Sequence, residues 1–165
     1  MISPREVLKK ELNRLRKFAY SLTGSQADAD DLVHDLAVKV LEKGLPEYED
    51  PVPWLITMCK NLWVDQLRYR EVRSRSQESD SPGEETNMSP EAELNLLHTE
   101  RVIRGLKLLP DHQRLALSLV AIEGMTYAET AEVLQIPIGT VMSRVARARE
   151  ILMEKFSEQT SGANK

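Results

Sequence analysis

Apolar residues recur along most of the chain at the spacing of three and four positions that gives a helix one buried side. In the first half, three such stretches follow one another: within residues 4–22, within residues 26–43, and from Trp54 to about residue 75. Gly24 separates the first two, and a Pro-Val-Pro run at residues 51–53 precedes the third. Such residues commonly end helices. Because few stretches alternate apolar and polar residues as a strand would, the pattern predicts an all-α protein.

The second half contains a more specific pattern, two helices joined by a tight turn. Thr126 and Glu129 have the spacing of a capping box, which predicts that a helix starts directly after Thr126. Pro137, which lacks a backbone donor, and Gly139 are expected to form the turn. Thr140 is then expected to cap the second helix. This order is typical of a helix-turn-helix, whose second helix can enter the major groove of DNA.

The second helix of this pair has a predicted buried side and a predicted outer side. Its apolar residues recur at i, i+4, i+7 and i+11, namely Val141, Val145, Ala148 and Leu152. The outer side carries Thr140, Ser143 and Arg147, with Arg144 and Arg149 on the two flanks. Arginine is common on the solvent-exposed side of any surface helix, so these arginines alone do not indicate DNA binding. The capped first helix, the turn and the clustered arginines together nevertheless favour DNA contact.

Residues 76–90 separate the two halves. They are polar, acidic and interrupted by proline and glycine, and Met88 is the one residue among them that a core could take up. The composition predicts a flexible acidic linker. It would join two small helical domains, residues 4–75 and residues 91–157, of which the second contains the helix-turn-helix.

Charge is unevenly distributed, although 22 basic and 26 acidic residues leave a net charge of only −4. Residues 23–35 carry four aspartates and no lysine or arginine, whereas residues 60–75 and 144–149 are rich in arginine. Affinity for phosphate comes from local basic patches. The acidic blocks therefore imply a second partner that is not DNA, or a means of limiting stray DNA binding.

The composition also disfavours several classes of protein. No apolar run approaches the roughly 20 residues needed to cross a bilayer, and the charged N-terminus lacks the apolar segment of a signal peptide. We therefore expect a cytoplasmic protein without membrane insertion. The lone Cys59 cannot form an internal disulfide, and its apolar neighbours predict a packing role.

Signals for catalysis are weak. Asp31 and His34 stand three positions apart, a spacing found in carboxylate-rich metal bundles, but no second matching pair lies near them in the sequence. The three histidines fall in different predicted elements, and neither a nucleophile motif nor a glycine-rich phosphate loop is present. We predict a binding protein that is not an enzyme and has no cofactor and no metal. The aspartates then form an acidic face for a basic protein partner.

The long helix after Trp54 is a second candidate for nucleic-acid binding. Basic residues follow phosphates, while amides and aromatic rings can read and stack on unpaired bases. All three kinds occur here, as Asn61, Gln66, Arg68, Tyr69, Arg70, Arg73 and Arg75. The alternative is a core helix with a solvated polar side. Both can hold, because the apolar and polar residues occupy different sides.

Three strings of residues together resemble a known family. They are Asp28-Ala29-Asp30-Asp31-Leu32-Val33-His34-Asp35, then Pro53-Trp54-Leu55 with Lys60-Asn61, and then Gly139-Thr140-Val141-Met142-Ser143-Arg144 with Arg147-Ala148-Arg149. On these strings the chain resembles a bacterial RNA polymerase sigma factor of the extracytoplasmic-function (ECF) group of the sigma-70 family. The likeness covers nearly the whole length and implies conserved region 2 for the first domain and region 4 for the second.

The resemblance implies a role for each charged block. Contact with core RNA polymerase would fall to Asp30, Asp31, His34 and Asp35. Asn61 would receive a flipped base of the minus-ten promoter element, and the strand would be steadied by Lys60, Arg68, Tyr69 and Arg70. The minus-thirty-five element would be read in duplex form by Thr140, Ser143, Arg144 and Arg147. In this recognition helix Met142 stands where the family commonly has lysine or arginine.

The implied partners are core RNA polymerase, promoter DNA and, by family habit, an anti-sigma factor. The protein would direct polymerase to promoters and help to open them without performing chemistry itself. The main alternative from the residues is an autonomous transcriptional regulator whose first domain senses or dimerises. A metal-dependent enzyme is a more remote alternative.

Overall fold

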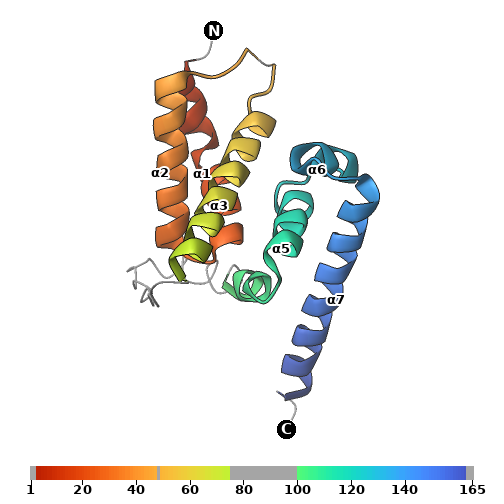
Figure 1. Ribbon diagram of the computed structural model, residues 1–165. Coiled ribbons are helices and arrows are strands. Elements are labelled where there is room, and N and C mark those ends of the chain that lie inside the picture. The colour runs from red at the N-terminus through yellow and green to blue at the C-terminus, as the bar shows by residue number, and fades with distance from the viewer. Residues whose placement is uncertain (1–2, 48, 75–99, 163–165) are drawn as a thin grey trace. The chain divides into compact units, whose positions relative to one another are not determined.

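The protein is described by a computed structural model, which covers residues 3–47, 49–74 and 100–162. It divides into two compact units, Met1–Thr86 and Asn87–Lys165. Every element among the described residues is a helix, which confirms the predicted all-α class (Figure 1). The predicted linker, residues 76–90, lies outside the described residues.

The first unit consists of three helices that pack on one another (Figure 1). They are α1 (Pro4–Thr23), α2 (Gln26–Lys43) and α3 (Val52–Ser74). A capping box between Ser3 and Glu6 starts α1. Gly24 ends it with a φ of 70°, a left-handed conformation that glycine adopts without steric cost. The predicted break between the first two helices is thus confirmed.

The core of the first unit is mainly aliphatic and also contains two buried aromatic residues, Phe18 and Trp63. Burying such side chains contributes about 1.5–3 kcal/mol each. The largest fully buried members are Phe18, Leu15, Leu22, Leu32, Leu36, Leu55 and Ile56. Cys59 is also fully buried, as its apolar neighbours predicted. Leu12 and Leu41 belong to the apolar patterns of their helices, yet both are exposed.

The second unit contains a helical segment at residues 100–107 and four further elements. These are α5 (Asp111–Leu117), a π-helical turn η1 (Ser118–Ile122), α6 (Tyr127–Leu134) and α7 (Ile138–Gly162). Both α5 and α6 pack on α7. Val141, Val145 and Ala148 are buried on α7 as predicted, and Leu152 is half-buried.

The π-helical turn was not predicted, since the apolar pattern indicated one helix from Leu115 to Ile122. The backbone N–H of Glu123 instead donates to the carbonyl of Ser118, five residues earlier, at 3.1 Å. Gly124 follows with a φ of 69°, and the chain leaves the helix there as expected. Over five residues, the apolar pattern of an α-helix cannot be distinguished from that of a wider π-helical turn. Both bury the same two or three side chains.

The helix-turn-helix is present, but its turn is built differently from the prediction. The capping box is confirmed: Thr126 Oγ1 accepts from the N–H of Glu129 at 3.0 Å, and the Glu129 carboxylate accepts from the N–H of Thr126 at 3.1 Å. The left-handed residue that ends α6 is Gln135, with a φ of 55°. Gln135 carries no sequence signal for a turn, whereas Pro137 and Gly139 do, and for this reason the turn was predicted at those two residues.

The expected cap at Thr140 is wrong. The second helix already begins at Ile138, so Thr140 lies within its first turn, and the N–H of Thr140 donates to the carbonyl of Pro137 at 3.0 Å. Proline fits directly before a helix, because its fixed φ suits the helix start and its missing N–H would have no partner there. Gly139 therefore sits inside α7 with helical geometry, and not in the turn.

Arg114 joins α5 to the preceding helical segment. Its Nε donates to the carbonyl of Leu106 at 2.9 Å, and its Nη2 donates to the carbonyl of Leu109 at 3.0 Å. The carbonyl of Leu106 also accepts from the N–H of Leu109 at 3.1 Å, so Arg114 is its second donor. The Arg114 side chain, which is only 13% exposed, thus ties the end of the preceding helical segment to α5.

Candidate protein and nucleic-acid interfaces

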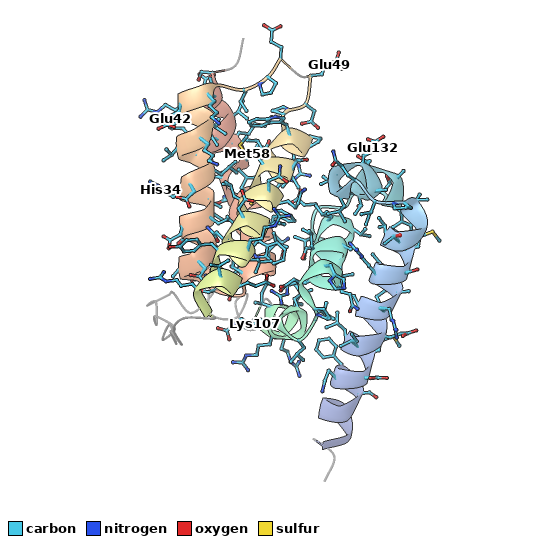
Figure 2. The ribbon with its side chains drawn as sticks, viewed as in Figure 1. His34, Glu42, Glu49, Met58, Lys107 and Glu132 are labelled. Atoms are coloured by element: carbon cyan, nitrogen blue, oxygen red, sulfur yellow. The ribbon has the colours of Figure 1, made fainter. Side chains whose placement is uncertain are left out.

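The acidic residues of α2 lie on its exposed side. Asp31, His34 and Asp35 are all exposed, and Figure 2 shows His34 on the side of α2 that faces away from α3. Asp30 is exposed as well, but its Oδ1 accepts from Arg16 Nε of α1 at 2.9 Å. This ion pair raises the pKa of Arg16. Three of the four predicted polymerase-binding residues thus face solvent directly, while Asp30 is partly neutralised.

Two apolar residues on the same side of α2 were missed by the sequence analysis. Val38 is 40% exposed and Leu41 57% exposed. They follow His34 by four and seven positions, so all three lie on one helix face. The sequence did contain a signal for these two residues, namely their spacing from His34. That spacing is compatible with Leu41 on the acidic face and equally with Leu41 in the core. We call the surface formed by Asp31, His34, Asp35, Val38 and Leu41 the α2 face.

The five predicted DNA-binding residues of α3 do not share one face. Asn61 and Arg68 are both exposed and stand seven positions apart, so they lie along one line of the helix, and exposed Tyr69 lies next to that line. Lys60, one position before Asn61, lies on the side away from Tyr69, and Arg70, two positions after Arg68, lies on the opposite face of α3. The Arg73 guanidinium lies over the Tyr69 ring, 5.9 Å from its centre, a cation–π contact that the sequence did not reveal.

Lys60 is half-buried beside these residues. Burial lowers its pKa, because an ammonium loses hydration there, and Asp65 opposes the shift. A partly desolvated cation interacts more strongly with a phosphate than a fully hydrated one.

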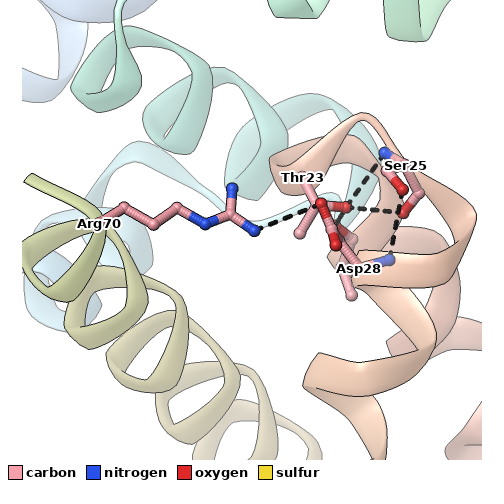
Figure 3. A network of polar contacts seen from close by, with 5 residues as sticks. Thr23, Ser25, Asp28 and Arg70 are labelled. Atoms are coloured by element: carbon pink, nitrogen blue, oxygen red, sulfur yellow. Dashed lines mark hydrogen bonds and ion pairs between the residues drawn. The ribbon is translucent and has the colours of Figure 1, made fainter. Parts of the chain in front are cut away.

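Arg70 is directed toward α2. Its Nη2 lies 3.4 Å from Asp28 Oδ2, and Figure 3 shows that Asp28 belongs to a polar network at the start of α2. Within this network the N–H of Asp28 donates to Ser25 Oγ at 3.3 Å, and Thr23 Oγ1 accepts from the N–H of Ser25 at 3.4 Å. The negative charge of Asp28 is favoured in the first turn of a helix.

The outer side of α7 carries the predicted reading residues. Ser143 and Arg147 are exposed one turn apart, and Thr140 and Arg144 are half-buried on one flank. The hydroxyl of Ser143 donates to the carbonyl of Gly139 at 3.0 Å, so its hydrogen is already in use. The structure therefore brings all four predicted residues to the first turns of the second helix of the helix-turn-helix. In such motifs these turns contact base edges.

No group of three or more histidine, cysteine or acidic side chains is arranged to hold a metal ion within the described parts of the chain. Among the same residues, no helix is long and apolar enough to span a membrane.

Both units match established families. Residues 7–73 match sigma-70 region 2, and residues 99–152 match sigma-70 region 4. SigE of Mycolicibacterium smegmatis, an ECF RNA polymerase sigma factor, is 30% identical over 94% of this chain and 62% of its own length. EcfG of Rhodopseudomonas palustris, also an ECF sigma factor, is 35% identical over 84% of this chain and 76% of its own length.

A solved structure shows the same fold. The sigma factor RpoE of Bartonella quintana, crystallised with the anti-sigma factor NepR, has a TM-score of 0.71 and 27% identity, covering 93% of this chain and 96% of its own. The chain belongs to the sigma-70 family of RNA polymerase sigma factors. Within that family it is an ECF sigma factor, a transcription initiation factor and not an enzyme, which binds core polymerase and recognises promoter DNA. The resemblance inferred from the sequence is thereby confirmed.

Proposed function

We propose a division of labour among three surfaces of this sigma factor. The α2 face and Asp30 bind core RNA polymerase. The residues Lys60, Asn61, Arg68, Tyr69 and Arg70 of α3 bind the opened minus-ten element. The residues Thr140, Ser143, Arg144 and Arg147 of α7 read the minus-thirty-five element. The observation that carries this proposal is that Asp31 and Asp35 are exposed on α2, whereas Arg68 and Arg147 are exposed on two other helices, α3 and α7.

The α2 face combines negative charge with exposed apolar residues. Interfaces typically have an apolar centre and a polar rim, and complementary charge speeds association. The surface fits a partner that is basic and partly apolar. We expect Asp31→Lys to abolish co-purification with core polymerase. The matched control is Glu49→Lys, because Glu49 is exposed in the loop after α2 (Figure 2) and undergoes the same change of charge. Equal co-purification of the two variants would remove the α2 face from the interface.

Asn61 offers an exposed amide, whose donor and acceptor can read the edge of an unpaired base. Asn61→Ala should slow open-complex formation on a duplex promoter, while Asn13→Ala, at an exposed site of α1, should not. A promoter with a premelted minus-ten bubble distinguishes two roles. If the Asn61→Ala defect persists on that DNA, Asn61 reads the base; if the defect vanishes, Asn61 acts in melting alone.

For α7, Arg147→Ala should cost about 1–3 kcal/mol of promoter binding by the holoenzyme if it removes a bidentate contact to a base. Arg101→Ala is the matched control, since Arg101 is exposed on another helix of the same unit. The assay is competition binding with a promoter selected by run-off transcription from a library. An equal response of both variants would place Arg147 outside the reading surface.

We further propose that the protein acts in the cytoplasm, where core polymerase is found, and that an anti-sigma factor binds and inhibits it. Support comes from RpoE of Bartonella quintana, which was crystallised with the anti-sigma factor NepR. Transcription by the purified holoenzyme should fall when such a partner is added. Core co-purification also tests the alternative of an autonomous regulator, which would bind promoter DNA tightly at physiological salt without polymerase.

A further inference from the structure

An apolar stripe runs along the exposed side of the first turns of α7. Ile138 is 49% exposed and Met142 52% exposed, and Ala146 is exposed one turn further on. Positions i, i+4 and i+8 lie on one face of a helix. Ile138 lies at the edge of the buried stripe, three positions before Val141, whereas Met142 and Ala146 lie further from it. Packing within the unit nevertheless leaves about half of Ile138 and of Met142 exposed.

The stripe borders the residues proposed to read DNA. Met142 directly precedes Ser143, and Ala146 directly precedes Arg147. The apolar stripe therefore has polar residues next to it in each turn of the helix. Because the hydroxyl hydrogen of Ser143 is bound by the carbonyl of Gly139, Ser143 offers a base only an acceptor. Much of the surface presented at the start of α7 is therefore apolar.

The occupant that best fits this stripe is duplex DNA. Exposed Arg149 stands eleven positions after Ile138, on the same line of the helix, and a cation there suits a phosphate on the rim of a groove. Exposed Arg147, which directly follows Ala146, is the arginine proposed above to read a base. Two large side chains are also far fewer than the roughly 20–30 residues per partner of a specific protein interface.

Thymine carries the apolar group that the major groove presents, its C5-methyl. Methionine is unbranched and polarisable, and it adapts its shape to such a group. We propose that Met142 and Ile138 recognise thymine methyl groups, so that the upstream promoter element includes thymines opposite the stripe. Such recognition rests on the proposed docking of α7 in the minus-thirty-five element.

Deoxyuridine provides the test, because it lacks the methyl group and keeps every hydrogen-bonding atom of thymine. A promoter is first selected with the holoenzyme from a library. Each thymine of its upstream element is then replaced singly by deoxyuridine, and holoenzyme binding is measured by competition. At one or two positions we expect a loss of about threefold to fivefold, the equivalent of one buried methyl group.

Met142→Ala should remove this sensitivity at one position, and Ile138→Ala at another. Met153→Ala is the matched control, because Met153 is 72% exposed on the same helix but lies three turns beyond Met142. It should retain the full response to deoxyuridine. All three residues are exposed, and circular dichroism establishes that the variants are folded.

Three results would overturn the recognition of methyl groups. One is a selected element without thymine, and another is thymine whose replacement never changes binding. The third is a Met142→Ala variant that responds to deoxyuridine like the parent protein but binds core polymerase more weakly, which would make the stripe a protein contact. Arg147→Ala distinguishes these failures from failure of the proposed docking. If Arg147→Ala weakens binding, α7 does read the element and only the methyl recognition is wrong.

Discussion

The guanidinium of Arg70 lies 3.4 Å from the carboxylate of Asp28, and this contact joins the last third of α3 to the first turn of α2. Both side chains are partly exposed, so the pair itself adds little stability. Its importance lies in competition. A DNA phosphate that binds Arg70 must replace a carboxylate that already stands there. Asp28 therefore opposes binding of nucleic acid at this end of α3.

Asp28→Asn should raise the affinity of the free protein for single-stranded DNA. The amide keeps the shape of the side chain but has no charge to hold Arg70. If Arg70 becomes one additional phosphate contact, the slope of log K against log salt should steepen by about 0.7. Fluorescence anisotropy with a labelled oligonucleotide at several salt concentrations measures both quantities.

Asp31→Asn is the control for this experiment. It removes the same charge from an exposed site three positions away on α2. An equal gain in both variants would show a general effect of net charge instead of a release of Arg70. Asp28→Asn combined with Arg70→Ala should return the affinity to that of the parent protein or below it.

Much of the fold could be predicted because helices leave local signals. Gly24 and the Thr126–Glu129 capping box act within a few residues, and each was found where it was expected. The errors arose where the local signal was absent or ambiguous. Gln135 adopts the left-handed conformation that glycine or asparagine usually takes, because packing of α6 on α7 overrides its own preference.

The candidate site was less predictable, because it depends on contacts between helices. Nothing in the spacing of Asp28 and Arg70, which are 42 positions apart, indicates that they meet. The same holds for Arg16 and Asp30, although here the predicted acidic face loses part of its charge. The exposure of Met142 follows from helical period alone. From the sequence, Met142 indicated only the loss of a lysine or arginine that the family commonly has. The exposed apolar neighbours Ile138 and Ala146 on α7 are what favour an apolar contact.

Lys60→Met should stabilise the first unit at neutral pH while weakening its binding to single-stranded DNA. Burial lowers the pKa of Lys60 below its ordinary value of 10.5, so the folded protein holds this proton less tightly than the unfolded chain does. The charged form therefore costs stability at all pH values below the lowered pKa. That cost disappears as the pH rises through the lowered pKa toward 10.5.

The free energy of unfolding of Lys60→Met should accordingly exceed that of the parent protein most strongly near pH 7. This difference should shrink as the solution becomes more alkaline. Urea unfolding followed by tryptophan fluorescence measures it, because both tryptophans, Trp54 and Trp63, lie in the first unit. Lys9→Met, at an exposed site of α1, is the control. A difference between Lys60→Met and the parent that stays constant from pH 7 to about pH 11, beyond the ordinary pKa of 10.5, would contradict the assigned cause.

Thr126→Ala should destabilise the second unit by about 1 kcal/mol, the usual cost of removing a helix N-cap. The change leaves the N–H of Glu129 without the hydroxyl that accepts its hydrogen bond at 3.0 Å. Thr126→Ser keeps that hydroxyl and should retain most of the stability. Thermal unfolding followed by far-ultraviolet circular dichroism compares the two, and equal midpoints would mean that the capping box does not stabilise α6.

Arg114→Lys should destabilise the second unit by about 1.5–3 kcal/mol, the usual contribution of one hydrogen bond to a charged group. The guanidinium spans two carbonyls, those of Leu106 and Leu109, and its side chain is only 13% exposed. One ammonium cannot reproduce that fork, so a buried carbonyl loses a hydrogen bond to a charged group. Arg104→Lys is the matched control, because the Arg104 side chain is 81% exposed and its ion pair with Glu100 has a separation of 3.9 Å.

The two units can be followed separately in the full chain, since tryptophan fluorescence reports the first unit and circular dichroism reports both. In urea unfolding, Arg114→Lys should shift the transition followed by circular dichroism to a lower urea concentration. The midpoint followed by tryptophan fluorescence should remain unchanged. A common shift of both signals would instead show that the two units unfold together. If neither signal moves, the hydrogen bonds of Arg114 to the preceding helical segment contribute nothing measurable, and that segment is held by the apolar packing of Ile103, Leu106 and Leu109 alone.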